Sequence, residues 1–199
     1  MEKRPKIISV SNQKGGVGKT TTTINLATAM VSFNKKILIV DLDPQANATT
    51  GLGFSSRNLD FSIYDVLSQQ VTTEQVILKT QTSNLDLLPS NIALTGAEIE
   101  LVTAFSREQR LQRALANALE AYDIILIDCP PALGLLTVNA FVVAKEILVP
   151  IQCEYYALEG LGQLLNTVRL VQQNLNKDLN IAGIIMTLSL IHISEPTRP

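Results

Sequence analysis

Short apolar runs separated by helix-like segments constrain the fold of this 199-residue chain. Most of the runs are apolar at every position rather than at every second one, which is typical of parallel strands buried on both faces. Six such runs are predicted to be strands: Ile7–Val10, Ile37–Val40, Leu85–Leu88, Ile124–Ile127, Ile147–Val149 and Ile181–Met186.

Helical periodicity fills the intervals between these runs. Apolar residues recur every three or four positions over Arg107–Tyr122, and the stretch 161–175 repeats the pattern. Strand and helix therefore alternate, which predicts an α/β fold: a doubly wound, mostly parallel sheet with helices on both faces and right-handed crossovers. The Ser-, Thr- and Gln-rich segment Gly51–Thr82 is predicted to be a loop with short helices such as Ile63–Leu67.

Composition limits the class of protein. Hydrophobic residues make up 46% of the chain, enough for the core of one domain, and the formal net charge of −2 gives no general reason to expect nucleic acid. No apolar run approaches the ~20 residues that span a bilayer, and no signal peptide is apparent, so we expect a soluble, cytoplasmic protein. The two cysteines, Cys129 and Cys153, form no Cys-x-x-Cys pair and are expected to be buried, reduced thiols.

A glycine-rich loop follows the first apolar run and leads into a predicted helix. Residues 14–21 read Lys-Gly-Gly-Val-Gly-Lys-Thr-Thr. Three glycines in four positions let the backbone curl so that successive N–H groups face phosphate oxygens, and the start of the helix adds its positive dipole end. Lys19 can then reach the β- and γ-phosphates, while the Thr20 hydroxyl can ligate Mg²⁺. The sequence therefore predicts a nucleotide-binding phosphate loop.

The loop departs from the general phosphate-loop pattern at two positions. Gln13 stands where that pattern has its first glycine, and Lys14 adds a second lysine. A lysine at the entrance of the loop is poorly placed to fold back on its own γ-phosphate, but it can reach a nucleotide across a subunit interface as an arginine finger does. The alternative for Lys14 is a solvated surface charge.

Three carboxylates end two of the predicted strands. Asp41 and Asp43 follow the run Ile37–Val40, which we expect to lie directly beside the strand of the phosphate loop. A carboxylate near the γ-phosphate can orient the attacking water. Asp128 ends the run Ile124–Ile127 and is placed for a metal-directed role. The alternative for each acid is a helix N-cap or a surface turn.

Three segments resemble the ParA/MinD group of ATPases. Residues 14–21 resemble the deviant Walker A motif of that group. Asp41–Thr49 resembles the second motif of its ParA (Soj-like) branch, although Ala46 stands where glycine is more usual. Ile124–Pro131 resembles the Walker B strand and switch II of the same branch. The similarity runs from Ile7 to about Ser189, and the Asp-Pro-Gln triplet favours ParA over MinD.

The resemblance implies a slow, partner-stimulated ATPase that uses ATP and Mg²⁺. Members of the family form a homodimer that sandwiches two nucleotides, bind non-specific DNA in that state, and release it after hydrolysis stimulated by a ParB partner. A nucleoid-associated protein for chromosome or plasmid partition is therefore expected. The resemblance does not distinguish chromosome, plasmid and other cargo.

The resemblance also assigns roles residue by residue. Lys14 would contact the nucleotide of the other subunit, Asp43 would orient the attacking water, and Asp128 would support Mg²⁺ through a water. Lys14, Lys19 and Asp43 are the catalytic candidates. The phosphates would be held by Gly15, Gly16, Val17, Gly18, Lys19, Thr20 and Thr21, with Thr20 also on Mg²⁺.

Other functions stay open at this point. A MinD-like membrane-cycling ATPase would need a C-terminal amphipathic helix, which is not visible in the sequence. A nucleotide-gated regulator would act through dimerisation alone. Iron-protein relatives hold a cluster through paired cysteines, which Cys129 and Cys153 do not match. For DNA contact, Arg169 and Lys177 are candidates, with ordinary surface charge as their alternative.

The domain boundary is placed near the end of the chain. Residues 1–189 are predicted to form one phosphate-loop ATPase domain that is incomplete at its C-terminal end. Residues 190–199 show no helix or strand pattern and resemble a translated sequencing adapter, so they are predicted to be a non-native tail. No function is assigned to residues in this tail.

Overall fold

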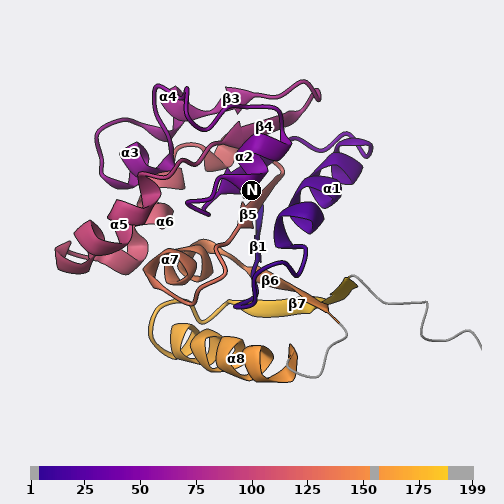
Figure 1. The fold of residues 1–199 in the computed structure, drawn as a ribbon, viewed down its shortest axis with the longest axis vertical. Helices are drawn as coiled ribbons and strands as arrows, with labels where there is room; N and C mark the ends of the chain where they lie inside the picture. Colours follow the sequence, from indigo (N-terminus) through magenta and orange to yellow (C-terminus); the bar gives the residue numbers. More distant parts are fainter. Residues whose placement is uncertain (1–4, 153–156, 188–199) are drawn as a thin grey trace, which may run out of the picture.

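A seven-stranded sheet forms the centre of the molecule in the computed structural model, which describes residues 5–152 and 157–187 (Figure 1). The strand order is β3-β4-β2-β5-β1-β6-β7, and every neighbouring pair is parallel except β3 and β4. The strands are β1 Lys6–Val10, β2 Ile37–Asp41, β3 Leu78–Lys79, β4 Leu85–Leu88, β5 Ile124–Asp128, β6 Glu146–Gln152 and β7 Asn180–Thr187.

All six predicted strands are present, and the predicted fold class is confirmed. The expected neighbourhood of β1 and β2 was wrong, because β5 lies between them. Leu126 in the middle of β5 is the register partner of Ile8 on one side and Ile39 on the other. Alternating strands and helices determine that the sheet is parallel, but they do not determine its strand order. The short antiparallel strand β3 was also missed, since two residues carry no periodicity.

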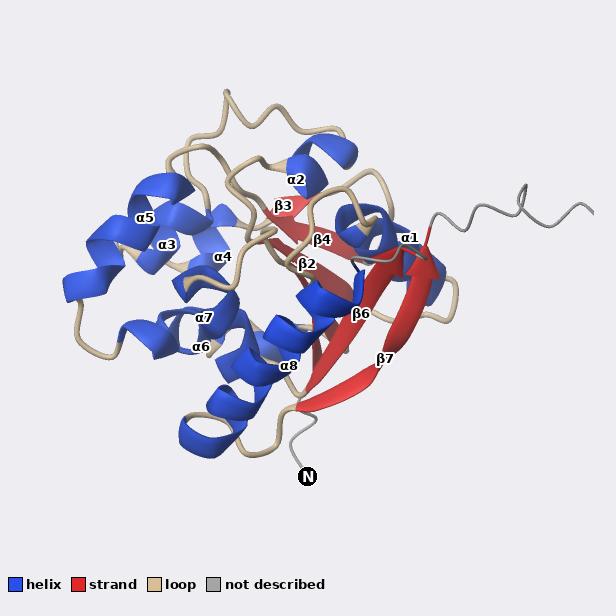
Figure 2. Cartoon of the chain, turned by 60° about the horizontal axis from the view of Figure 1, so that its bottom comes forward, coloured by secondary structure: helices blue, strands red, loops and turns tan. Residues whose placement is uncertain are grey.

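Helices cover both faces of the sheet. Figures 1 and 2 show α1 on one side and α7 and α8 on the other. One apolar cluster joins Ala27 of α1 to Ile39 and Leu126 of the strands, and a larger cluster joins Phe141 of α7 to the opposite face. The helices are α1 Lys19–Val31, α2 Asn47–Gly51, α3 Ile63–Leu67, α4 Thr73–Val76, α5 Leu94–Glu100, α6 Arg110–Leu115, α7 Leu135–Val143 and α8 Ala157–Asn174, with 3₁₀ turns η1 Leu101–Thr103, η2 Arg107–Gln109 and η3 Leu119–Ala121.

The predicted helix Arg107–Tyr122 was wrong as a single element, since η2, α6 and η3 replace it. In a continuous helix the amide of Leu111 would donate to the carbonyl of Arg107, four residues earlier. The side chain of Asn139 takes both places instead. Its Oδ1 accepts from the Leu111 amide at 3.0 Å, and its Nδ2 donates to the Arg107 carbonyl at 2.9 Å. The buried amide from α7 therefore interrupts the helix near its start.

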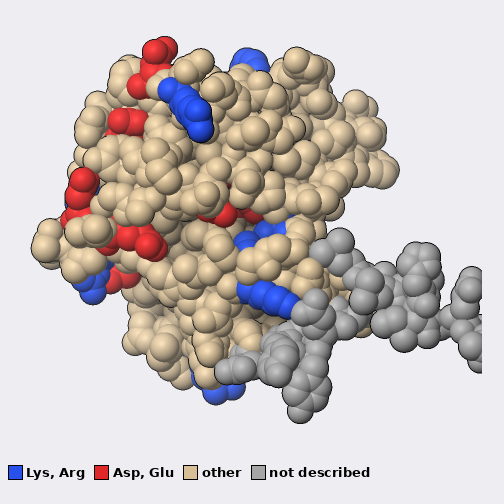
Figure 3. Space-filling view, in the orientation of Figure 1, with Lys and Arg blue, Asp and Glu red and all other residues tan. Residues whose placement is uncertain are grey.

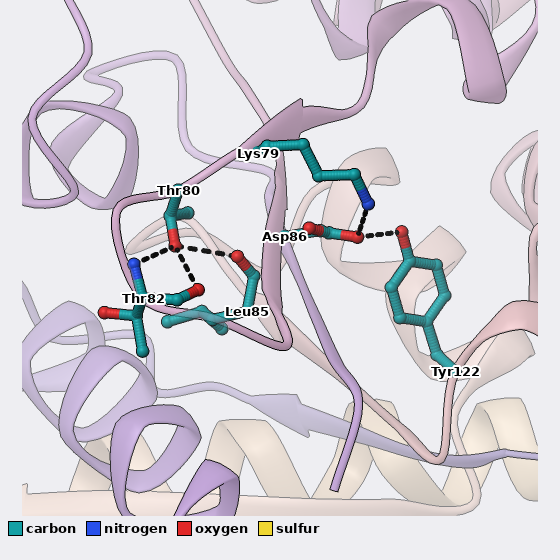
Figure 4. A network of polar contacts seen from close by, with 6 residues as sticks. All are labelled: Lys79, Thr80, Thr82, Leu85, Asp86 and Tyr122. Atoms are coloured by element: carbon teal, nitrogen blue, oxygen red, sulfur yellow. Dashed lines mark hydrogen bonds and ion pairs between the residues drawn. The ribbon is translucent and has the colours of Figure 1, made fainter.

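A buried polar cluster fastens the β3 edge of the sheet (Figure 4). The carboxylate of Asp86 is almost fully buried and accepts hydrogen bonds from Tyr122 Oη at 2.8 Å and Lys79 Nζ at 2.6 Å. Burial and the Asp86 carboxylate raise the pKa of Tyr122. Nearby, Thr80 Oγ1 donates to the carbonyl of Leu85 at 2.7 Å. The Tyr122 hydrogen bond ties this antiparallel edge to the segment before β5, and the other two contacts join β3 and the residue that follows it to β4.

Of the two cysteines, the structure describes Cys129. Cys129 is fully buried, as predicted, and burial raises the pKa of its thiol to about 12. Cys153 and the predicted tail 190–199 lie outside the described residues. Within the described ranges, no helix has the length and apolar character that crossing a membrane requires.

Candidate phosphate-binding site

The loop between β1 and α1 has the backbone geometry that its glycines predict. Gly16 and Gly18 have φ values of +73° and +83°, in the left-handed region where other residues are strained. Gly18 is also the N-cap of α1, which begins at Lys19. The chain therefore turns sharply from the end of β1 into the N-terminus of a 13-residue helix, where unpaired amide groups favour an anion.

A cavity of about 680 Å³ lies beside this loop. It is open at the carboxyl ends of several parallel strands, the place where ligands bind in doubly wound sheets. Figure 3 shows basic and acidic side chains close together near the centre of one face of the molecule. The cavity is lined by Gly15, Gly16, Gly18, Lys19, Thr20, Thr21, Thr22, Asp43, Gln45, Asn47, Pro131 and Thr187.

Lys19 provides a buried positive charge at the cavity. Its side chain is 7% exposed, and its Nζ donates to the carbonyl of Lys14 at 3.0 Å. Burial lowers the pKa of Lys19, while the negative charges of Asp128 and Asp43 oppose that shift. A buried ammonium group with so little water around it gains strongly from an anionic ligand.

Asp128 and Thr20 bring oxygen atoms together at the start of α1. Thr20 Oγ1 donates to Asp128 Oδ2 at 2.7 Å, and Thr23 Oγ1 lies 3.3 Å from Asp128 Oδ1. Burial raises the pKa of Asp128 to about 7, and the charges of Asp41 and Asp43 add to this effect.

These oxygen atoms fit Mg²⁺. Within the part of the chain that the structure describes, no cluster of three or more His, Cys, Asp or Glu side chains could form a complete metal site. Mg²⁺ is usually held by one or two protein oxygens together with phosphate and water oxygens. The pair Thr20 and Asp128 matches that pattern, because the remaining ligands would come from a nucleotide and solvent.

The two acids after β2 have different environments. Asp43 is nearly buried, lines the cavity, and accepts a hydrogen bond from the Gln45 amide at 2.9 Å. Asp41 does not line the cavity and is fully buried. Its carboxylate accepts from the Thr49 amide at 2.8 Å, the Thr49 hydroxyl at 2.7 Å and the Asp43 amide at 3.2 Å. Burial raises its pKa to about 6. Asp41 therefore stabilises the turn into α2, and Asp43 faces the cavity.

Some predicted loop residues do not line the cavity themselves. The side chain of Val17 is buried in the protein, and the Lys14 amide donates to Asn12 Oδ1 at 3.0 Å. Sequence reasoning also missed five lining residues. Four of them lie within or directly beside the three motifs, namely Thr22, Gln45, Asn47 and Pro131, and the fifth is Thr187. The available signal was its place at the end of the last predicted strand, which a parallel sheet brings to the same edge as the phosphate loop.

Comparison with known proteins identifies the family. Residues 5–181 match a family described as an AAA domain. The chain is 54% identical over 183 residues to the sporulation initiation inhibitor protein Soj of Bacillus subtilis strain 168, covering 92% of this chain and 72% of that protein. It is 50% identical over 183 residues to the chromosome partitioning protein ParA of Myxococcus xanthus, covering 92% and 65%. The chain belongs to the ParA/Soj family of partitioning ATPases.

Solved structures share the fold of this ParA/Soj family member. A cobyrinic acid a,c-diamide synthase from Mycobacterium smegmatis, with bound ATP analog and magnesium, has a TM-score of 0.89 and 41% identity, covering 92% of this chain and 74% of that one. A plasmid partition protein from Borrelia burgdorferi has a TM-score of 0.81 and 30% identity, covering 92% and 79%. The family resemblance and the phosphate-loop fold expected from the sequence are both confirmed.

Proposed function

We propose that this chain binds Mg²⁺-ATP in the cavity beside residues 15–21 and hydrolyses it as the switch of a partition system. The observation that carries the proposal is the convergence of Lys19, Thr20, Asp43 and Asp128 on one edge of the sheet, beside a glycine loop. The binding of an ATP analog and magnesium by a solved relative supports it. Asp43 and Asp128 lie at the ends of two different strands, and Lys19 and Thr20 begin α1, so a shared purpose explains their proximity better than chance does.

Each residue has a distinct role in this proposal. The amides of Gly15 to Thr21 and the Lys19 ammonium group bind the phosphates, while Thr20 would ligate Mg²⁺ and Asp128 would support it through a water. The metal, when bound, neutralises charge on the phosphates. Asp43 orients a water for attack on the γ-phosphorus. The bond to the bridging oxygen of ADP breaks, and ADP and inorganic phosphate leave. This chemistry needs positioning more than a strong base.

Dimerisation is the second part of the proposal. Gly15 and Gly16 are exposed beside the cavity, which leaves this face open for a second copy. The Lys14 side chain would reach the nucleotide of the partner subunit, and the ATP-bound homodimer would bind non-specific DNA on the nucleoid. A ParB-like protein would stimulate hydrolysis and release. The family membership supports these steps, and the Asp-Pro-Gln triplet of the ParA branch favours partition over a MinD-like cycle at the membrane.

One experiment tests nucleotide, dimer and DNA together. Size-exclusion chromatography of the protein with Mg²⁺-ATP should show a dimer, with Mg²⁺-ADP a monomer, and with Mg²⁺-ATP plus a random DNA duplex a larger complex. The variant Lys19→Ala should stay monomeric in every condition. A wild-type protein that shows no affinity for Mg²⁺-ATP would refute the proposed function at its first step.

A further inference from the structure

The phosphate loop is fastened by side chains from the two neighbouring strands β6 and β7. Gln152 and Thr187 are register partners at the carboxyl ends of these strands. Gln152 Nε2 donates to the carbonyl of Gly16 at 3.1 Å, and Thr187 Oγ1 donates to the carbonyl of Val17 at 2.6 Å. Two adjacent side chains therefore hold two successive carbonyl groups of the loop.

Holding these carbonyl groups also sets the direction of amide groups. In a trans peptide, the carbonyl of one residue and the N–H of the next point in opposite directions. A hydrogen bond to the Gly16 carbonyl therefore orients the Val17 N–H, and a hydrogen bond to the Val17 carbonyl orients the Gly18 N–H. Both amides belong to the loop that binds phosphate in the proposed function. Without these hydrogen bonds, the conformational freedom of Gly16 and Gly18 would let the two peptide planes rotate.

Thr187 is placed to act on the loop rather than only to satisfy its own hydroxyl. Its hydroxyl lies 2.6 Å from the Val17 carbonyl and 3.3 Å from the carbonyl of Ile151, so its single hydrogen belongs mainly to the loop. Thr187 also lines the cavity, and its side chain lies 3.6 to 3.8 Å from where a Cβ on Gly18 would be. The residue is therefore both a wall of the cavity and a support for the loop.

A third side chain fastens the entrance of the loop to the same strand. Asn12 Nδ2 donates to the carbonyl of Pro150 in β6 at 2.6 Å, while its Oδ1 accepts from the Lys14 amide at 3.0 Å. The loop is thus held on its β6–β7 side at both its entrance and its glycine turn. Its other end continues directly into α1.

We propose that Thr187, assisted by Gln152, is a positioning residue that holds the phosphate loop in the conformation that binds nucleotide. This inference rests on the proposed function and goes beyond it, because it assigns a role in phosphate binding to the carboxyl end of the edge strand β7. Thr187 would act through the backbone of Val17 and Gly18 and would not need to touch the phosphates itself.

The test compares Thr187→Val, which keeps the shape and removes the hydroxyl, with Thr187→Ser, which keeps the hydroxyl. We expect Thr187→Val to weaken Mg²⁺-ATP and Mg²⁺-ADP binding about fivefold, the effect of one neutral hydrogen bond. Thr187→Ser should bind like wild type. In the nucleotide-free protein, Thr187→Val should also speed amide hydrogen exchange over residues 14–20, a local change that a general loss of stability would not produce.

Thr80→Val is the matched control. It also removes a threonine hydroxyl that donates to a backbone carbonyl, at the opposite edge of the sheet (Figure 4). It should leave nucleotide affinity and loop exchange unchanged. Should Thr187→Val fail to fold, Gln152→Leu provides the test. It is expected to weaken binding about twofold, since this hydrogen bond is longer and more exposed.

The outcomes separate this inference from the proposed function. Wild-type affinity in folded Thr187→Val, or in Gln152→Leu when the first variant does not fold, would overturn the positioning role. Weak binding in both Thr187→Val and Thr187→Ser would overturn it as well, since the hydroxyl would then not be the cause. Absence of binding by the wild-type protein would instead overturn the proposed function.

Discussion

Replacing Asp128 by asparagine should stabilise the nucleotide-free protein at alkaline pH. The carboxylate is fully buried beside two other acids, and its pKa is raised to about 7 from an ordinary value of 3.8. A shift of about three units corresponds to an ionisation penalty of about 4 kcal/mol above pH 7. Asparagine nearly preserves the shape and keeps an oxygen for the Thr20 hydroxyl, but it carries no charge. It therefore removes the penalty.

The raised pKa of Asp128 determines whether the stability of the wild-type protein rises or falls with pH. An acid with a raised pKa binds its proton more tightly in the folded protein than in the unfolded chain. Wild-type stability from Asp128 is therefore highest at low pH, falls as the pH rises past about 4, and levels off above about 7. Between pH 5 and pH 8 this loss amounts to roughly 2 to 3 kcal/mol. The Asp128→Asn variant should lack it.

Urea unfolding at pH 5 and pH 8 measures the effect. The free energy of unfolding of Asp128→Asn, minus that of wild type, should rise by about 2 to 3 kcal/mol between pH 5 and pH 8. Comparing two pH values cancels the fixed cost of an asparagine NH₂ group that lacks a partner, about 1 to 3 kcal/mol. The reasoning is refuted when this difference does not change with pH or changes in the opposite direction.

The other predictions concern nucleotide, hydrolysis, dimer and fold in turn. Lys19→Ala should lower Mg²⁺-ATP affinity at least a hundredfold, because a buried charge facing the phosphates is lost; titration calorimetry showing wild-type affinity would contradict this. Asp43→Ala should bind ATP normally but hydrolyse it roughly a hundredfold more slowly, and normal phosphate release would remove Asp43 from its role. Gly15→Val should still bind ATP, because a Cβ there meets only Pro131, at 4.0 Å. It should stay monomeric, because the added bulk lies on the exposed face proposed for the second copy; an ATP-dependent dimer in light scattering would count against the sandwich. Tyr122→Phe should cost about 1 to 2 kcal/mol in unfolding and leave nucleotide affinity unchanged, because its hydroxyl bonds only a distant buried carboxylate.

The parts of the structure that follow from local pattern were predictable. Continuous apolar runs identified six strands, and the glycine spacing located the turn at Gly16 and Gly18 where φ is positive. Lys19 and Thr20 line the cavity because the loop and the start of α1 are contiguous in sequence. The roles assigned to these residues, and the domain boundary after residue 189, stay predictions.

The rest depended on contacts between distant segments. The helix expected over Arg107–Tyr122 was interrupted by the Asn139 side chain, which no periodicity of the segment itself could reveal. The family resemblance pointed to Asp43, but the residues alone left the role of Asp41 open, because two acids two positions apart both end a strand. The hydrogen bonds from Thr49 show that Asp41 stabilises the turn into α2, and Thr49 lies eight residues further along the chain.

The inserted strand β5 has a direct chemical consequence. Were β1 and β2 neighbours, as the sequence led us to expect, Asp128 could not be the register partner of residues in both strands. Because β5 lies between them, Asp128 is the register partner of Asp41 and of Val10, the residue that leads into the phosphate loop. The position of β5 therefore brings the Asp128 carboxylate to the Thr20 hydroxyl and also buries this carboxylate next to Asp41. A cation at this edge would relieve that repulsion, so the strand order that destabilises the nucleotide-free protein is also what would make this edge favour a metal-bound nucleotide.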